Sequence, residues 1–156
     1  MRMMRRLAVI VVLALAACTA QNPDLPSFAA SEAALPPPAP GTARLYFYRL
    51  LEPYEIRTGT TLFLNGAAVG YLRNGAVTYR DVPPGTYAVA VDSPGAFPNQ
   101  FKTVAVRQGQ TWYFQVQSLL SLSCTSRHDC RGPIFVVAIV DPARARAEIA
   151  PLGLSR

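Results

Sequence analysis

Short apolar stretches separated by turn residues run through the chain from Ala43 to Val140. In the segment TYAVAVD, Tyr87, Val89 and Val91 alternate with small residues, which is the period-two pattern of a half-buried strand. Patterns of this kind predict eight strands, at 43–49, 60–65, 68–72, 76–82, 86–92, 101–107, 111–117 and 134–140. The last of these is apolar throughout, so we expect it to be buried on both faces.

The residues between these stretches suit tight turns. Asn65-Gly66 and Asn74-Gly75 supply the positive φ angles that two-residue hairpins need, and Pro84-Gly85 fits the centre of a type II turn. A helix is indicated only by the segment PARARAEI, at 142–149. Eight short strands at roughly ten-residue spacing predict one all-β sandwich or barrel. We place this domain at 43–150, followed by a short tail at 151–156.

The N-terminus has a different pattern. Three arginines and no acidic residue stand in the first six positions, and an eleven-residue apolar run then extends from Leu7 to Ala17. This run is too short to span a bilayer, which takes about 20 apolar residues, and the pattern predicts a cleaved signal peptide at 1–17.

Leu15-Ala16-Ala17-Cys18 resembles the lipobox of bacterial lipoproteins. The resemblance implies that Cys18 becomes the first mature residue and carries the acyl chains that anchor the protein to a membrane. An Asp at the position of Thr19 would resemble an inner-membrane retention signal. Its absence favours the outer membrane, with the domain facing the periplasm. An ordinary signal peptide followed by a chance cysteine is the alternative.

Residues 18–42 form the predicted linker between anchor and domain. Six prolines fall between 19 and 41, with no apolar periodicity, so we expect an unfolded spacer. At about 3.1 Å per residue, it would hold the domain on the order of 60–70 Å from the lipid. A proline-rich ligand for a partner protein is the alternative.

Charge excludes one class of partner. Fifteen basic and nine acidic residues give +6, but Arg2, Arg5 and Arg6 leave with the signal peptide, so twelve against nine remain and the mature chain carries +3. It has no Lys/Arg cluster of the kind that follows a phosphate backbone, and we therefore expect no nucleic-acid partner.

Four segments carry a family resemblance: ARLYFYR at 43–49, LNGAAVGYLRNG at 64–75, DVPPGTYAV at 81–89 and VRQGQTWYF at 106–114. In this order they resemble successive blocks of small bacterial lipoproteins that carry the domain-of-unknown-function family 2846, over residues 43 to 149. The resemblance implies a compact β-sandwich of a transthyretin-like or carboxypeptidase-regulatory-like kind, with no established activity. The cysteine-bearing insert at 118–133 departs from it.

That insert holds the chain's other two cysteines. In an exported protein, Cys124 and Cys130 are expected to form a disulfide. The alternatives are free thiols and a metal site formed with His128, although the sequence offers no obvious fourth ligand. A catalytic triad is not expected of Ser126, His128 and Asp129, because three residues within four positions are too close together to orient as a triad requires. The sequence also has no Gly-x-Ser-x-Gly elbow. We therefore expect no catalytic residues, no metal and no cofactor.

The carboxylates of the predicted domain that lie outside the insert are scattered, and nothing in the sequence pairs them as a catalytic acid and base. They are Glu52, Glu55, Asp81, Asp92, Asp141 and Glu148. Asp81 and Asp92 are predicted to be turn residues that accept hydrogen bonds from their own backbone.

Two surfaces are candidates for binding. In ARLYFYR, Leu45 and Phe47 share one face, so Tyr46 and Tyr48 are predicted to look outward, with Tyr113 added to them. Exposed tyrosines of this kind suit glycans or protein interfaces, whereas cross-strand aromatic packing is the competing explanation. The second surface is the 124–130 loop, where a disulfide would fix the positions of Arg127, His128 and Arg131, at the end of the sandwich away from Ala43.

These expectations combine into a function. The chain is predicted to be a membrane-anchored, non-enzymatic interaction or structural module of the cell envelope, and its partner another envelope protein. The alternative is a glycan- or peptidoglycan-binding module that uses the exposed tyrosines.

Overall fold

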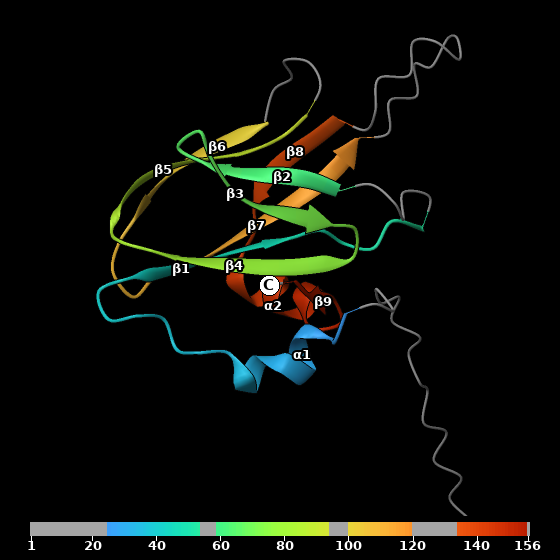
Figure 1. The fold of residues 1–156 in the computed structure, drawn as a ribbon, viewed down its shortest axis with the longest axis horizontal. Coiled ribbons are helices and arrows are strands. Elements are labelled where there is room, and N and C mark those ends of the chain that lie inside the picture. The colour runs from blue at the N-terminus through green and yellow to red at the C-terminus, as the bar shows by residue number, and fades with distance from the viewer. Residues whose placement is uncertain (1–24, 54–58, 94–99, 120–133, 156) are drawn as a thin grey trace, which may run out of the picture.

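The computed structural model describes residues 25–53, 59–93, 100–119 and 134–155, which form two packed β-sheets with a helical layer on one of them (Figure 1). The five-stranded sheet has the order β8 (Ile134–Ile139), β7 (Thr111–Leu119), β1 (Ala43–Tyr48), β4 (Ala76–Val82) and β9 (Gly153–Leu154). The four-stranded sheet has the order β3 (Ala67–Arg73), β2 (Gly59–Leu64), β5 (Gly85–Val91) and β6 (Phe101–Val106). The predicted all-β sandwich is confirmed, and each predicted strand is present within two residues of its expected bounds.

Strand pairing is antiparallel except at two places in the five-stranded sheet. There β1 pairs in parallel with β7, and β4 pairs in parallel with the short β9. The main core fills the space between the sheets, and in it Phe47 and Phe114 stack with ring centroids 5.4 Å apart. Aliphatic side chains of the other sheet, among them Leu62, Leu72 and Val89, close this core from the opposite side.

The turns agree with the sequence only in part. Asn65 and Gly66 both have positive φ, at 50° and 81°, as a tight hairpin requires. At the next turn only Gly75 has a positive φ, at 69°. Asn74 is buried there, and its side chain makes hydrogen bonds with the backbone N–H and C=O of Glu52. The predicted type II turn at Pro84-Gly85 is wrong: Gly85 already pairs with Val106 as the first residue of β5, so its backbone is extended.

A third layer covers the outer side of the five-stranded sheet. It consists of α1 (Phe28–Ser31), the 3-10 turn η1 (Glu32–Ala34), α2 (Pro142–Ile149) and the C-terminal residues around β9 (Figure 1). Helix α2 matches its predicted range, and the Asp141 carboxylate caps it by accepting the N–H groups of Ala143 and Arg144. A second core lies beneath this layer, so β1 is buried along its whole length. In β8, by contrast, Ile139 is 45% exposed, so the expectation of full burial on both faces is wrong for that edge strand.

The predicted unfolded spacer is wrong for residues 25–35, which are part of the folded body. Phe28 is 3% exposed within the second core, and its backbone N–H donates to the Leu152 carbonyl at 2.6 Å. Leu152 and Leu154 are buried as well, so the residues beyond 150 belong to the domain and not to a free tail. A single buried aromatic in a proline-rich segment makes no periodic pattern, which is why the sequence did not reveal this docking.

Candidate functional site

The three tyrosines expected to form a binding surface are buried. Tyr46, Tyr48 and Tyr113 are at most 8% exposed, because α1 and α2 cover the face on which they lie. The rings of Tyr46 and Tyr113 stack at 5.2 Å, and Phe28 meets Tyr46 edge-on at 5.6 Å. The prediction of an outward aromatic surface at these positions is wrong, and packing beneath the helical layer takes its place.

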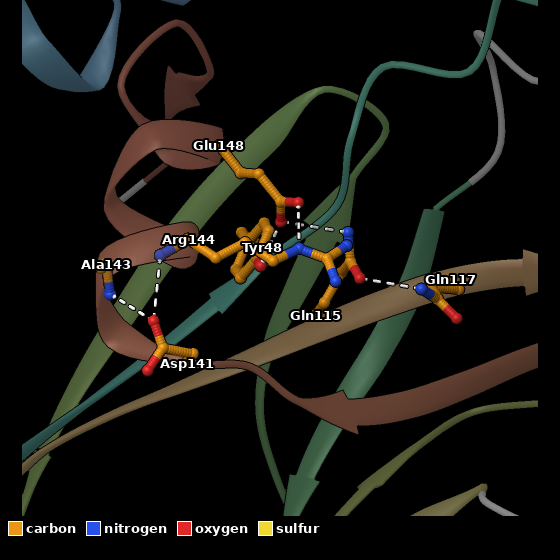
Figure 2. A network of polar contacts seen from close by, with 7 residues as sticks. All are labelled: Tyr48, Gln115, Gln117, Asp141, Ala143, Arg144 and Glu148. Carbon is orange, nitrogen blue, oxygen red and sulfur yellow. Dashed lines mark hydrogen bonds and ion pairs between the residues drawn. The ribbon is translucent and has the colours of Figure 1, made fainter.

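Glu148 lies at the centre of a polar network between α2 and the sheet (Figure 2). Its carboxylate accepts the Tyr48 hydroxyl at 2.6 Å, the Arg144 Nε at 2.7 Å and, more weakly, the Gln115 Nε2 at 3.4 Å. The Gln115 amide oxygen in turn accepts a bond from Gln117 at 2.8 Å. A carboxylate held by three donors is a fixed acceptor and not a free general base, so this network joins α2 to β1 and β7.

Burial raises the pKa of Tyr48, and its hydrogen bond to Glu148 raises it further. We expect Tyr48→Phe to lower the free energy of unfolding at neutral pH by about 1–2 kcal/mol, because it removes a hydrogen bond to a charged group. A tyrosine in the unfolded chain ionises near pH 10, while the native one stays protonated. The difference in free energy of unfolding between the wild type and Tyr48→Phe should therefore shrink as the pH rises above about 10. Urea titrations at pH 8 and above 10 should show the difference between variant and wild type shrinking.

Tyr87→Phe is the matched control for that experiment. Its hydroxyl donates to the Pro83 carbonyl in an exposed bond of 2.8 Å, so we expect a small effect on the free energy of unfolding. A Tyr48→Phe difference that stays constant through pH 10 would contradict the assigned role of the buried hydroxyl.

Arg44 and Asp81 form a buried ion pair across β1 and β4. Two bonds of 2.7 Å join the Arg44 Nε and Nη2 to the two carboxylate oxygens, and Nη2 also donates to the Pro36 carbonyl at 2.9 Å. The guanidinium lies 4.2 Å from the ring centroid of Tyr79. The hydrogen bond to Asp81 is the main cause that raises the pKa of Arg44. The prediction that Asp81 is a turn residue is wrong, since it lies within β4 and bonds another strand.

Three other described carboxylates are also engaged separately from one another. Glu52 pairs with the wholly buried Arg49 at 2.5 Å, Glu148 with Arg144, and Asp141 with the first turn of α2. Within the described ranges, no three His, Cys, Asp or Glu side chains lie close enough together to hold a metal ion. In the same ranges, none of the helices is both long and apolar enough to cross a membrane.

A groove of about 370 Å³ lies where β7 begins and α2 starts. Its lining residues are Gln110, Thr111, Trp112, Tyr113, Ile139, Val140, Asp141 and Pro142. Asp141 is the single carboxylate among them, and it is already the N-cap of α2. The groove therefore offers apolar contact but no acid–base pair for catalysis.

The outer face of the four-stranded sheet carries the most exposed aromatics of the described chain: Phe101 is 64% and Tyr71 54% exposed. On this face Phe63 lies opposite Ala90, and Ala90 opposite Phe101, so one row crosses three strands. Its ten positions, called the outer platform from here on, are Thr61, Phe63, Ala68, Tyr71, Thr86, Ala88, Ala90, Phe101, Thr103 and Ala105. None of these ten residues is charged, but the exposed Arg73 lies on the same face at the end of β3, opposite Gly59.

The outer platform was not recognised from the sequence, although a signal for it existed. In FKTVAV the core residues Val104 and Val106 share one face, so Phe101 must lie on the other. Likewise, Tyr71 directly precedes the core residue Leu72 in β3. The alternation identifies which residues face outward, and outward aromatics beside uncharged outward residues are the informative feature.

The remaining predicted site residues lie outside the described residues: Cys18, Cys124, Cys130, Arg127, His128 and Arg131. Lipidation of Cys18, the disulfide and the loop surface therefore stay predictions.

Comparison with known proteins agrees with the resemblance seen in the sequence. The model of one protein family, described as a protein of unknown function (DUF2846), matches residues 39–128, which is more than half of the 156-residue chain. No curated protein matches the chain. The matched range contains β1 to β7 and ends before β8, α2 and β9, so it is shorter than the range expected from the sequence. With the sandwich fold and this match together, the chain belongs to the DUF2846 family of proteins of unknown function.

Proposed function

We propose that this protein is a lipid-anchored component of the bacterial cell envelope, held by Cys18 in the outer membrane and facing the periplasm. Its sandwich serves as a non-enzymatic module that docks another envelope protein. The lipobox-like segment behind a short apolar run supports the anchor. The separate engagement of Asp81, Glu52 and Glu148 in ion pairs supports a role without catalysis.

The outer platform is the observation that carries the docking role. Interface centres are depleted in charge and enriched in aromatic residues, and the platform combines ten uncharged positions with exposed Tyr71 and Phe101, while the one charged residue of β3 on this face, Arg73, lies at its end. An exposed apolar patch on a regular sheet marks an interaction site more often than a scattered apolar residue does. The partner that fits is a protein whose surface is apolar opposite the ten platform positions, because a charge placed over them would lose its hydration without gaining a counter-charge.

The size of the platform indicates how strong the complex is. Four strands about 4.8 Å apart and about 21 Å long cover roughly 400 Å². A standard stable interface buries about 800 Å² on each partner, so the platform by itself suits a weak or transient complex. Anchoring both partners to one membrane would raise their effective concentration and offset the small area.

The test is binding by a variant with both exposed aromatics removed. A photo-crosslinking amino acid at Thr103 captures the partner in cells, mass spectrometry identifies it, and its affinity is then measured with purified proteins. We expect Tyr71→Ser/Phe101→Ser to weaken that binding by about 10- to 100-fold, as the loss of two interface aromatics does.

Ile139→Ser is the matched control, because it removes an exposed apolar side chain of similar exposure from the other sheet. It should leave both crosslinking and affinity unchanged. Undiminished binding by the folded double variant would overturn the docking role of the platform. If the double variant instead loses sedimentation with purified sacculi and keeps its protein crosslinks, the platform binds glycan and the protein-docking proposal is wrong.

A further inference from the structure

Two opposite charges lie at one end of the outer platform. Arg73 is the last residue of β3 and Asp92 follows the last residue of β5, and both are exposed. Arg73 lies opposite Gly59 at the start of β2. The Asp92 N–H donates to the Thr61 carbonyl at 2.9 Å, which continues the register of β5 with β2. Because the preceding Val91 lies in the core, the Asp92 side chain is on the platform side of the sheet.

Tyr71 lies beside Arg73 on the same face of β3, two positions earlier. A Cβ on Gly59 would stand 2.6 Å from two ring carbons of Tyr71, so the ring occupies the space that a side chain at residue 59 would fill. An exposed tyrosine and an exposed arginine thus meet at this end, and both residue types are enriched in the hot spots of protein interfaces. Tyr71, Arg73 and Asp92 are called the charged corner from here on.

The two charges of this corner are available to a partner. Neither side chain forms an ion pair or a hydrogen bond with another described residue. Two strand spacings across the sheet and one two-residue step along it separate their backbones by about 12 Å. This separation exceeds the Debye length of about 10 Å at 0.1 M salt, so Arg73 and Asp92 do not neutralise each other.

We infer that the charged corner orients the docked partner, an inference that rests on the docking role proposed above. The partner is a protein that presents a carboxylate to Arg73 and a lysine or arginine to Asp92, beside an apolar surface that covers Phe63 and Phe101. Apolar contact is non-directional, so the platform alone accepts a partner in several orientations. Two opposite charges at one end distinguish one of these orientations from its reversal and speed the encounter.

Charge at this end has a second possible use. Charged side chains protect edge strands from pairing with other chains, and β3 is an edge strand. Protection of this kind works with a charge of either sign at each position. Orientation of a partner, by contrast, requires a positive charge at residue 73 and a negative one at residue 92. Exchanging the two charges therefore separates the two roles.

The exchange variant Arg73→Glu/Asp92→Arg has the net charge of the wild type but reverses the corner. Its affinity is measured for the purified protein that was captured by crosslinking at Thr103. We expect binding at low salt to weaken by about 10-fold or more, mainly through slower association, because each charge now faces one of its own sign. At about 1 M salt, where the Debye length is about 3 Å, the loss should largely disappear.

Arg107→Glu is the matched control for Arg73→Glu alone. Arg107 is also exposed, but it follows β6 at the opposite end of the platform, so its reversal should change the affinity little. Equal losses from both single reversals would show that general charge attraction is sufficient and would overturn the inference. A folded exchange variant that binds as the wild type does would overturn it as well.

The aromatic double variant distinguishes this inference from the proposed function. If Tyr71→Ser/Phe101→Ser binds undiminished, or if Thr103 captures no protein, the docking role is wrong and the orientation falls with it. If that variant binds weakly while the exchange variant binds normally, the platform docks a protein and the orienting role of Arg73 and Asp92 alone is wrong.

Discussion

Asp81→Ala is expected to lower the free energy of unfolding by about 3 kcal/mol. The change removes the carboxylate and leaves the Arg44 guanidinium, whose side chain is 6% exposed, buried without its counter-charge. Breaking a buried pair from one side typically costs about 3–5 kcal/mol, and the lower end applies because the Asp81 side chain is 22% exposed. Urea unfolding of wild type and variant measures the difference.

Two further contacts explain why Arg44 does not simply turn to solvent in that variant. Its guanidinium lies over the Tyr79 ring, and its Nη2 bonds the Pro36 carbonyl. Arg44 also belongs to β1, which is hydrogen-bonded to β4 on one side and β7 on the other. The charge is therefore held in place by the sheet after its partner has gone, and the desolvation cost persists.

Two further variants test whether the loss in Asp81→Ala comes from a buried charge without its partner. Arg144→Ala breaks the pair with Glu148, but the Arg144 side chain is 63% exposed, so we expect a much smaller loss of stability than for Asp81→Ala. The double variant Arg44→Met/Asp81→Ala removes both charges, so it should be more stable than Asp81→Ala alone. A loss below about 0.5 kcal/mol for Asp81→Ala would show that the pair is solvated and contributes little.

The strands and the α2 helix could be predicted because their signals are local. The alternation within TYAVAVD depends on neighbours a few positions away, and so does the start of the PARARAEI helix, where Asp141 is the N-cap and Pro142 follows. Both elements lie where the sequence predicted them. The choice of which strands pair with one another does not depend on local signals. The parallel pair of β1 with β7 joins residues more than 60 positions apart, and no local pattern encodes that choice.

The binding surface was misplaced for a related reason. Alternation showed correctly that Tyr46 and Tyr48 lie opposite Leu45 and Phe47, but it does not show whether a second layer covers a face. The covering layer comes from the two ends of the domain, at α1 and α2, which meet only in the folded state. The outer platform lacks such a cover among the described residues, so its aromatics are the ones that stay exposed.

Phe28→Ala is expected to lower the free energy of unfolding by about 3 kcal/mol and to release the segment from Leu25 to Leu35. Truncation of a buried phenylalanine typically costs about 3–5 kcal/mol, and the lower end applies because a four-residue helix can detach and limit the loss. Amide exchange separates the two effects. The Ala29 N–H, which donates to the Ala150 carbonyl at 3.0 Å, should lose protection far more than the N–H groups of β1 do.

Ser27→Ala is the control, because it removes only the cap whose hydroxyl accepts the Ala30 N–H at 3.3 Å. A cap contributes about 1 kcal/mol, and Phe28 would remain docked, so Ala29 should keep most of its protection. Full protection of the Ala29 N–H in the Phe28→Ala variant would show that Phe28 does not hold the segment.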